Sequence, residues 1–386
     1  MLLKNNQAFF RLWVGSLFAS LGNIFFEVVV VWYLVVATGS ALVAAGIPIA
    51  AMMGGILSSA LITNRIDQIP TKKLMLFSLG TRCLLLVILL IFQETITRSP
   101  LGLFIYSFIL AILSLIWFLA RAKSIPEVVT QDELVKANGL EGVSAGIVRI
   151  AAWGLGGFFI TRFDLNTSIL FTLAAALIAT YFLMIARWRP VLGEKDPKSQ
   201  GLLEGLNIMN QEPTVKRIIY SEVLFYFFMG FLWVAFPIKV DALGDGLLYG
   251  YQGMAFGIGY LITSLMIAKR GSSKIKTFYL AGLAFYMIGN IFMSIALTGW
   301  VLLSGLLISG LATSYWITGR QTLIHTNIPT HEVGKVFSLF ELGAGLVQIP
   351  GFLLGGLLVD HFGFTWLMIL ISLLQFSCFI WLRRIK

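Results

Sequence analysis

Residues 10–37, FRLWVGSLFASLGNIFFEVVVVWYLVVA, carry two charged side chains, Arg11 and Glu27, in a run of otherwise apolar and small polar residues. A helix needs about 20 such residues to cross the ~30 Å hydrocarbon core of a bilayer. The segment is therefore long enough to span a membrane. Because lipid offers no partners to backbone amides, it must span as a helix.

The rest of the chain has the same character. Of its 386 residues, 58% are hydrophobic and 12% are charged, whereas soluble domains have about 25% charged residues. So little polar surface excludes soluble enzymes and disordered chains. Cys83 and Cys378 lie in apolar runs, so we expect no disulfide framework and no metal site. The first apolar run has no small-residue cleavage site, and we expect no signal peptide.

Similar apolar windows recur along the chain, without the alternation of a membrane barrel, and predict an all-α membrane protein with about twelve spans. The windows cover residues 10–37, 41–63, 73–93, 101–120, 134–160, 166–187, 217–239, 247–268, 276–296, 299–319, 333–359 and 363–382.

Lysine and arginine residues orient these spans. Of the 28 basic residues, 23 lie at or between span ends on the side of the N-terminus, and three lie on the other side. Basic residues concentrate on the cytoplasmic side of a membrane. We therefore expect a multi-pass protein of the cell membrane with both termini in the cytoplasm. The net charge of +10 reflects this bias, and we expect no nucleic-acid partner.

One long polar connection, residues 188–216, is rich in Pro, Gly and charged residues. It predicts a cytoplasmic linker, with a short amphipathic helix on the membrane surface, between bundles of six helices at residues 1–187 and 217–386. The two halves repeat at an offset of 199 residues. The coinciding pairs are Arg121 and Arg320, Glu133 and Glu332, Lys136 and Lys335, and Gly156–Gly157 and Gly355–Gly356. Duplicated halves with a midplane site between them are typical of secondary transporters.

Four segments carry a resemblance to a known family. They are SLGNIFFEVVVVWYLVVATGSALVAAG (20–46), ARAKSIPEVV (120–129), DELVKANGL (132–140) and GKVFSLFELGAG (334–345). With them the chain resembles the major facilitator superfamily over nearly its whole length, in particular the twelve-helix bacterial efflux branch that includes macrolide and siderophore exporters. The resemblance implies two pseudo-symmetric six-helix bundles and transport of a small molecule by alternating access.

Two segments depart from the family pattern. In residues 54–73, GGILSSALITNRIDQIPTKK, Asn64 occupies the acidic position of the loop signature, which leaves Arg65 and Asp67 as the charged gate residues nearby. The antiporter motif G-P-x-x-G-G of the fifth helix reads AWGLGG at residues 152–157 and lacks the leading Gly-Pro. Both departures concern gating and proton antiport, and neither affects the fold.

A polar stripe on the first helix is the strongest site candidate. Ser16, Ser20, Asn23 and Glu27 share one helical face. Glu27 lies roughly 24 Å along the helix from Arg11, at about 1.5 Å per residue. A charged group at that depth must face a cavity or a partner. We expect Glu27, with Asn23, to couple transport to protons or to recognise a cation. The alternative is an ion pair with an arginine of a neighbouring helix.

Arg82 and Arg149 are the arginines in position for such a pair, since both lie in mid-span. Arg149 is flanked by small residues that let a neighbouring helix approach, so packing and pairing is one interpretation. For Arg82 a structural role is the alternative to substrate contact. If either guanidinium faces the cavity, it favours substrates with a carboxylate or phosphate group.

Aromatic, sulfur and amide side chains at helical spacing in the second half predict an adaptable substrate surface. With Ser20 from the first half, the candidates are Tyr226, Met229, Trp233, Gln252, Phe256, Thr313, Trp316 and Gln348. The alternative for the aromatic residues is ordinary packing. Glu222, within the first turns of its predicted span, is expected at the membrane interface.

Charged residues at the cytoplasmic span ends are gate candidates. Arg121 and Glu133 recur in frame as Arg320 and Glu332, which predicts a charged latch; solvated loop charges are the alternative. Glu341 is expected to act as a gate or in a helix-end charge pair, and Glu141 likewise.

These observations predict a secondary exporter of a small amphiphilic, zwitterionic or anionic compound, of the drug, metallophore or siderophore class. We expect proton antiport, a monomer in the lipid bilayer, and no cofactor. A lipid or lysolipid flippase, or an importer, remains the alternative. A membrane-embedded enzyme is remote, because the three histidines lie in loops or at helix ends without metal-ligand spacing, and a phosphate-binding loop is absent from the sequence.

Overall fold

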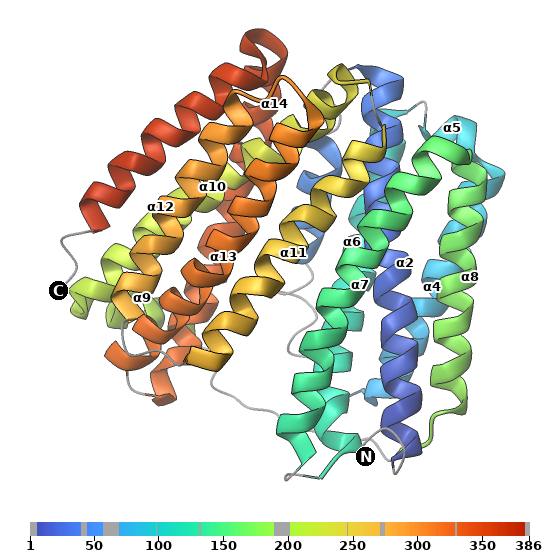
Figure 1. Ribbon diagram of the computed structural model, residues 1–386. Helices are drawn as coiled ribbons and strands as arrows, with labels where there is room; N and C mark the ends of the chain where they lie inside the picture. Colours follow the sequence, from blue (N-terminus) through green and yellow to red (C-terminus); the bar gives the residue numbers. More distant parts are fainter. Residues whose placement is uncertain are drawn as a thin grey trace. The chain divides into compact units, whose positions relative to one another are not determined.

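The computed structural model describes residues 6–39, 45–56, 69–97, 99–130, 133–188, 201–244, 246–270, 275–328 and 330–382. Throughout these ranges the chain is helical apart from short connections (Figure 1). It divides into two compact units, one of Met1–Ala37 with Gly46–Asp196 and one of Thr38–Ala45 with Pro197–Lys386.

The helices of the first unit follow the predicted spans. In chain order they are α2 (Gln7–Thr38), the helix Ala45–Ile56, α4 (Thr71–Ile91), the short α5 (Gln93–Thr97), α6 (Pro100–Val128), α7 (Leu134–Arg162) and α8 (Leu165–Ile185). In the second unit they are α9 (Gly201–Gln211), α10 (Pro213–Ala242), α11 (Gly246–Arg270), α12 (Ile275–Ser294), α13 (Gly299–Asn327) and α14 (Thr330–Leu382).

Among the described residues, nine helices are long and apolar enough to cross a membrane. Each predicted window overlaps a described helix, which confirms an all-α membrane protein. The second window is described only over Ala45–Ile56, so the number of twelve spans stays a prediction. The short helix predicted in the linker is present as α9, which packs against α14.

Local sequence explains where several helices begin and break. Pro100 occupies the first turn of α6, and the Ser99 side chain accepts a hydrogen bond from the Gly102 N–H at 3.1 Å. Asp164 caps α8 by accepting from the Thr167 N–H at 2.9 Å. Gly363, at φ 78°, divides α14 where the sequence predicts a boundary between the last two spans.

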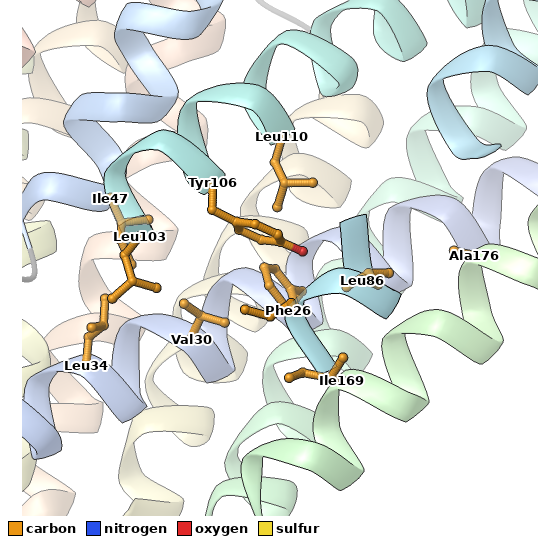
Figure 2. Close-up of a cluster of buried hydrophobic side chains, with 11 residues drawn as sticks. Phe26, Val30, Leu34, Ile47, Leu86, Leu103, Tyr106, Leu110, Ile169 and Ala176 are labelled. Atoms are coloured by element: carbon orange, nitrogen blue, oxygen red, sulfur yellow. The ribbon is translucent and has the colours of Figure 1, made fainter. Parts of the chain in front are cut away.

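One apolar core cluster of the first unit is contributed by α2, the helix Ala45–Ile56, α4, α6 and α8. Figure 2 shows Phe26, Leu86, Tyr106 and Ile169 converging at its centre, with Leu103 and Val30 beside them. Phe26 and Tyr106 lie with ring centroids 6.1 Å apart. This cluster holds α2 against α4 and α6, and thereby fixes the polar face of α2.

Glycines set the close approach of helices in both units. An added Cβ on Gly355 in α14 would lie 2.6 Å from the Cα of Phe231 in α10. An added Cβ on Gly156 in α7 would lie 2.6 Å from Cγ1 of Val28 in α2. Small residues at such crossings let helices pack closely without a hydrophobic driving force from water.

Gly355→Ala is expected to lower the free energy of unfolding by about 1–3 kcal/mol, because the new methyl group forces α10 and α14 apart. The measurement is the midpoint temperature of unfolding in detergent micelles. Gly80→Ala is the matched control, since an added Cβ there has no described atom within 4 Å. Equal midpoints for the two variants would contradict the proposed close packing.

Candidate functional site

A cavity of about 290 Å³ lies within the first unit. Polar side chains from three helices line it, together with a few apolar ones. From α2 come Ala19, Ser20, Asn23 and Ile24, from α4 come Ser78, Leu79 and Arg82, and from α6 come Ser114, Trp117, Phe118 and Arg121. Two residues of the predicted α2 stripe, Ser20 and Asn23, thus meet Arg82 around one cavity.

The two arginines of this cavity differ in their partners. Arg121 forms an ion pair with Glu141 of α7, which lies outside the lining. Arg82 is 7% exposed and forms no hydrogen bond or close ion pair with another described residue. None of the described lining residues is a carboxylate, so Arg82 contributes a positive charge to this part of the cavity. Such a cavity suits an anionic group.

Glu27 lies apart from this lining, one turn beyond Asn23 on α2. Its side chain is exposed, as is that of Arg149 on α7. Glu27 interacts electrostatically with Arg149 and, more weakly, with Arg82. Within the described part of the chain neither arginine forms an ion pair with it at 4.0 Å or less. Glu27, Arg149 and Arg82 therefore interact electrostatically without a close ion pair.

Ser16 is the remaining residue of the predicted polar stripe on α2. It is 2% exposed, and its hydroxyl has no hydrogen-bond partner in the described ranges. The stripe is therefore divided along α2, with Ser16 packed, Ser20 and Asn23 at the cavity, and Glu27 exposed.

A second charged centre is buried in the C-terminal unit. Glu222 of α10 is 1% exposed and accepts hydrogen bonds from the Tyr279 hydroxyl at 3.0 Å and from the Trp316 indole N–H. Its Oε2 lies 3.2 Å from Nη1 of Arg320, which is 4% exposed and interacts with Tyr226 as well. The Arg320 guanidinium also lies 4.4 Å from the ring centroid of Phe340. We call Glu222, Tyr279, Trp316 and Arg320 the Glu222 network.

The interfacial position expected for Glu222 stays a prediction, while the structure shows its side chain buried in the C-terminal unit. Sequence hydropathy places the start of its span at residue 217, whereas α10 begins at Pro213. Glu222 is consequently nine residues into the helix, or about 13 Å at 1.5 Å per residue. Pro213 after Glu212 is a typical first helical residue and was the signal that could have placed the start of the helix at residue 213.

The predicted substrate residues of the second half are dispersed over several environments. Trp316, 2% exposed, belongs to the Glu222 network, and its ring centroid lies 6.1 Å from that of Tyr226. Met229 accepts a hydrogen bond from the Tyr286 hydroxyl at 2.9 Å. Trp233 is 46% exposed.

The remaining candidates of the second half lie on three further helices. Gln252 in α11 is buried, and its side-chain oxygen has no partner in the described part of the chain. Thr313 is buried in α13 and donates to the Ser309 carbonyl at 2.7 Å. Phe256 and Gln348 are partly buried, and the carbonyl of Gln348 lies close to Gly230. The role of all these residues in binding stays a prediction.

The structure gives partners for three of the four predicted latch residues, and the latch itself stays a prediction. Arg121 pairs with Glu141, the helix-end pair expected for that glutamate, while Glu133 accepts from the Thr130 backbone N–H at 3.4 Å. Arg320 is buried in the Glu222 network rather than among solvated charges. Asn64, Arg65 and Asp67, and the side chains of Glu332 and Glu341, lie outside the described residues.

Comparison with known proteins agrees with this architecture. A family model described as the Major Facilitator Superfamily matches residues 12–219 and again residues 218–386. Macrolide efflux protein A of Streptococcus pyogenes is 22% identical over 372 residues, which cover 92% of this chain and 90% of that protein. An uncharacterized MFS-type transporter of Bacillus subtilis (strain 168) is 23% identical, with 73% and 72% covered.

Solved transporter structures share the fold. The crystal structure of the nucleoside transporter NupG superimposes with a TM-score of 0.77 at 11% identity, covering 98% of this chain and 100% of that one. A bacterial homologue of the iron transporter ferroportin, in an inward-facing state, gives a TM-score of 0.77 at 16% identity, with 98% of each chain covered.

Proposed function

This chain belongs to the Major Facilitator Superfamily, and on that premise we propose that it is a secondary active exporter. Its substrate is a small amphiphilic, zwitterionic or anionic compound of the drug, metallophore or siderophore class. Transport proceeds by alternating access in exchange for protons. The protein works as a monomer in the cell membrane, with both termini in the cytoplasm.

The observation that carries this proposal is the polar cavity of the first unit, with Arg82 in its lining. Within a membrane, a cavity that holds a charged and hydrogen-bonding set of side chains marks a substrate or ion pathway. The similarity to Macrolide efflux protein A over 92% of this chain supports export as the direction. Glu27, an acidic residue of α2 that interacts electrostatically with two arginines, supports coupling to protons.

Expression in a bacterial host that lacks its own exporters is expected to raise the inhibitory concentration of one class of compound several-fold. The panel should hold macrolides, other amphiphilic drugs and metal chelators, because the proposal names these chemical classes. Cellular accumulation of the protected compound should fall as well. The measurement is growth across concentrations, with accumulation of the compound in the same cells.

The control is the same host carrying the empty vector. A protonophore should restore accumulation of the compound to the level of this control, because it removes the gradient that drives export. Unchanged susceptibility to the whole panel, with the protein present in the membrane, would count against export of these classes.

A further inference from the structure

The fourth helices of the two units carry the same pair of side chains. α6 (Pro100–Val128) and α13 (Gly299–Asn327) have equal lengths and are offset by 199 residues. In this frame Trp117 corresponds to Trp316, and Arg121 corresponds to Arg320. Trp316 and Arg320 bind the carboxylate of Glu222. Trp117 and Arg121 instead line the 290 Å³ cavity.

Glycine contacts give the register of the first helices of the two units. Gly156 faces Val28, while Gly355, its counterpart at the offset of 199, faces Phe231. Val28 and Phe231 are therefore counterparts, so α2 and α10 correspond at an offset of 203. At this offset the counterpart of Glu222 is Ala19.

Ala19 lies in the cavity lining and is 8% exposed. At this position α2 carries a methyl group, whereas α10 carries the longer, acidic side chain of Glu222. The two units thus share an indole and a guanidinium, but their carboxylates come from different helices. Glu222 of α10 binds both groups in the C-terminal unit, whereas in the first unit Glu141 of α7 pairs with Arg121, and α2 carries Ala19 at the position that corresponds to Glu222. In the described part of the chain, the Trp117 indole N–H has no hydrogen-bond partner.

The positive charge of Arg82 also favours binding of an anion in this cavity. It reaches the same cavity from α4 and lacks a close anionic partner among the described residues. Hydroxyl groups of Ser20 and Ser114 and the amide of Asn23 can complete the hydrogen bonding of a carboxylate. Trp117 and Phe118 offer an apolar surface to the rest of a ligand.

From these features we infer that the cavity of the N-terminal unit binds the carboxylate of the transported compound, in the place that Glu222 fills in the C-terminal unit. The inference rests on the proposed transport function. Arg82 and the Trp117 N–H bind the carboxylate, and an apolar tail packs on the two aromatic rings. The volume is near the lower end of ligand pockets, about 300–1,000 Å³, so the cavity holds a small acid or the acidic end of a larger one.

The test uses benzoate as the probe and benzamide as its neutral analogue of similar shape. Binding to the purified full-length protein in detergent micelles is measured by saturation-transfer-difference NMR titration at neutral pH. Benzoate is expected to bind at least about tenfold more tightly than benzamide, because charge-assisted hydrogen bonds are roughly twice as strong as neutral ones.

Three substitutions localise the site. Arg82→Gln is expected to weaken benzoate binding about tenfold or more and benzamide binding little. Ala19→Glu is expected to abolish benzoate binding, because the new carboxylate occupies the site as Glu222 does. Trp117→Phe keeps the ring, removes the N–H and should weaken benzoate binding several-fold. Arg162→Gln is the matched control, since Arg162 is exposed at the end of α7 and outside the lining.

Each variant is first checked by size-exclusion chromatography, and only folded protein is titrated. Equal affinity for benzoate and benzamide in the wild type would overturn the inference. So would folded Arg82→Gln or Trp117→Phe protein that binds benzoate as the wild type does. These outcomes concern binding alone and leave the export phenotype to be judged by the susceptibility panel, so the two proposals can fail separately.

Discussion

Glu222→Ala is expected to lower the free energy of unfolding by about 3–5 kcal/mol, because removing one partner leaves a buried charge uncompensated. That charge is Arg320, which is 4% exposed and lies 3.2 Å from the Glu222 carboxylate. The Tyr279 hydroxyl and the Trp316 indole N–H would lose their acceptor as well. The measurement is the midpoint of thermal unfolding in detergent micelles, with the yield of monodisperse protein.

Two further variants separate this cause from a general effect of mutation. Asp241→Ala, at an exposed acid on the same helix, is expected to change stability by less than about 0.5 kcal/mol. Glu222→Ala combined with Arg320→Leu should recover much of the loss, since the double variant buries no unpaired charge. Wild-type stability in the single variant would show that the Glu222 network does not hold α10, α12 and α13 together.

Glu27→Gln is expected to abolish transport driven by a pH gradient and to leave exchange of substrate across the membrane intact. Glutamine has nearly the shape of a protonated glutamate but cannot release a proton. Glu27 interacts electrostatically with Arg149 and Arg82, so the substitution removes a titratable group that interacts with both arginines. This expectation follows from the proposed coupling to protons.

The measurement is uptake of the compound identified by the susceptibility panel into proteoliposomes, with and without an imposed pH gradient. Glu94→Gln is the matched control, because Glu94 is an exposed acid of the same unit in the short α5. Gradient-driven transport that is unchanged in Glu27→Gln would remove Glu27 from the coupling mechanism. Loss of exchange as well would assign it to substrate binding instead.

Much of the helical architecture could be predicted because each segment that crosses lipid must be a helix of about 20 mostly apolar residues. A window such as residues 73–93 predicts a helix, and α4 occupies Thr71–Ile91. The break between the last two spans follows from a glycine that takes a positive φ at Gly363. The residues at which helices begin and end were harder to predict. The first turn of α10, before residue 217, is polar and therefore gives no hydropathy signal. For this reason the sequence placed Glu222 nearer to the start of its helix than it lies in α10.

The candidate site could be predicted only in part. Helical spacing placed Ser20 and Asn23 on one face, and both line the cavity. The same spacing placed Ser16 and Glu27 on that face, yet one is packed and the other exposed. Spacing along one helix does not say which neighbouring helix covers each turn. The partner of Arg121 could not be predicted for the same reason. Glu133 and Glu141 are both near it in sequence, and of these two Glu141 pairs with it.

The sequence by itself determined that the chain is a membrane protein of helical spans in two repeated halves, since each span must satisfy its own backbone hydrogen bonds in lipid. Only the tertiary structure decided which charges meet. Glu222 and Arg320 are far apart in the chain and become partners because α10 and α13 pack in one unit. At the corresponding positions of the first unit, Ala19 and Arg121 line the 290 Å³ cavity, and Arg121 pairs with Glu141 of α7 instead. Such pairing depends on the rotation and depth of neighbouring helices, which glycine contacts between distant segments set.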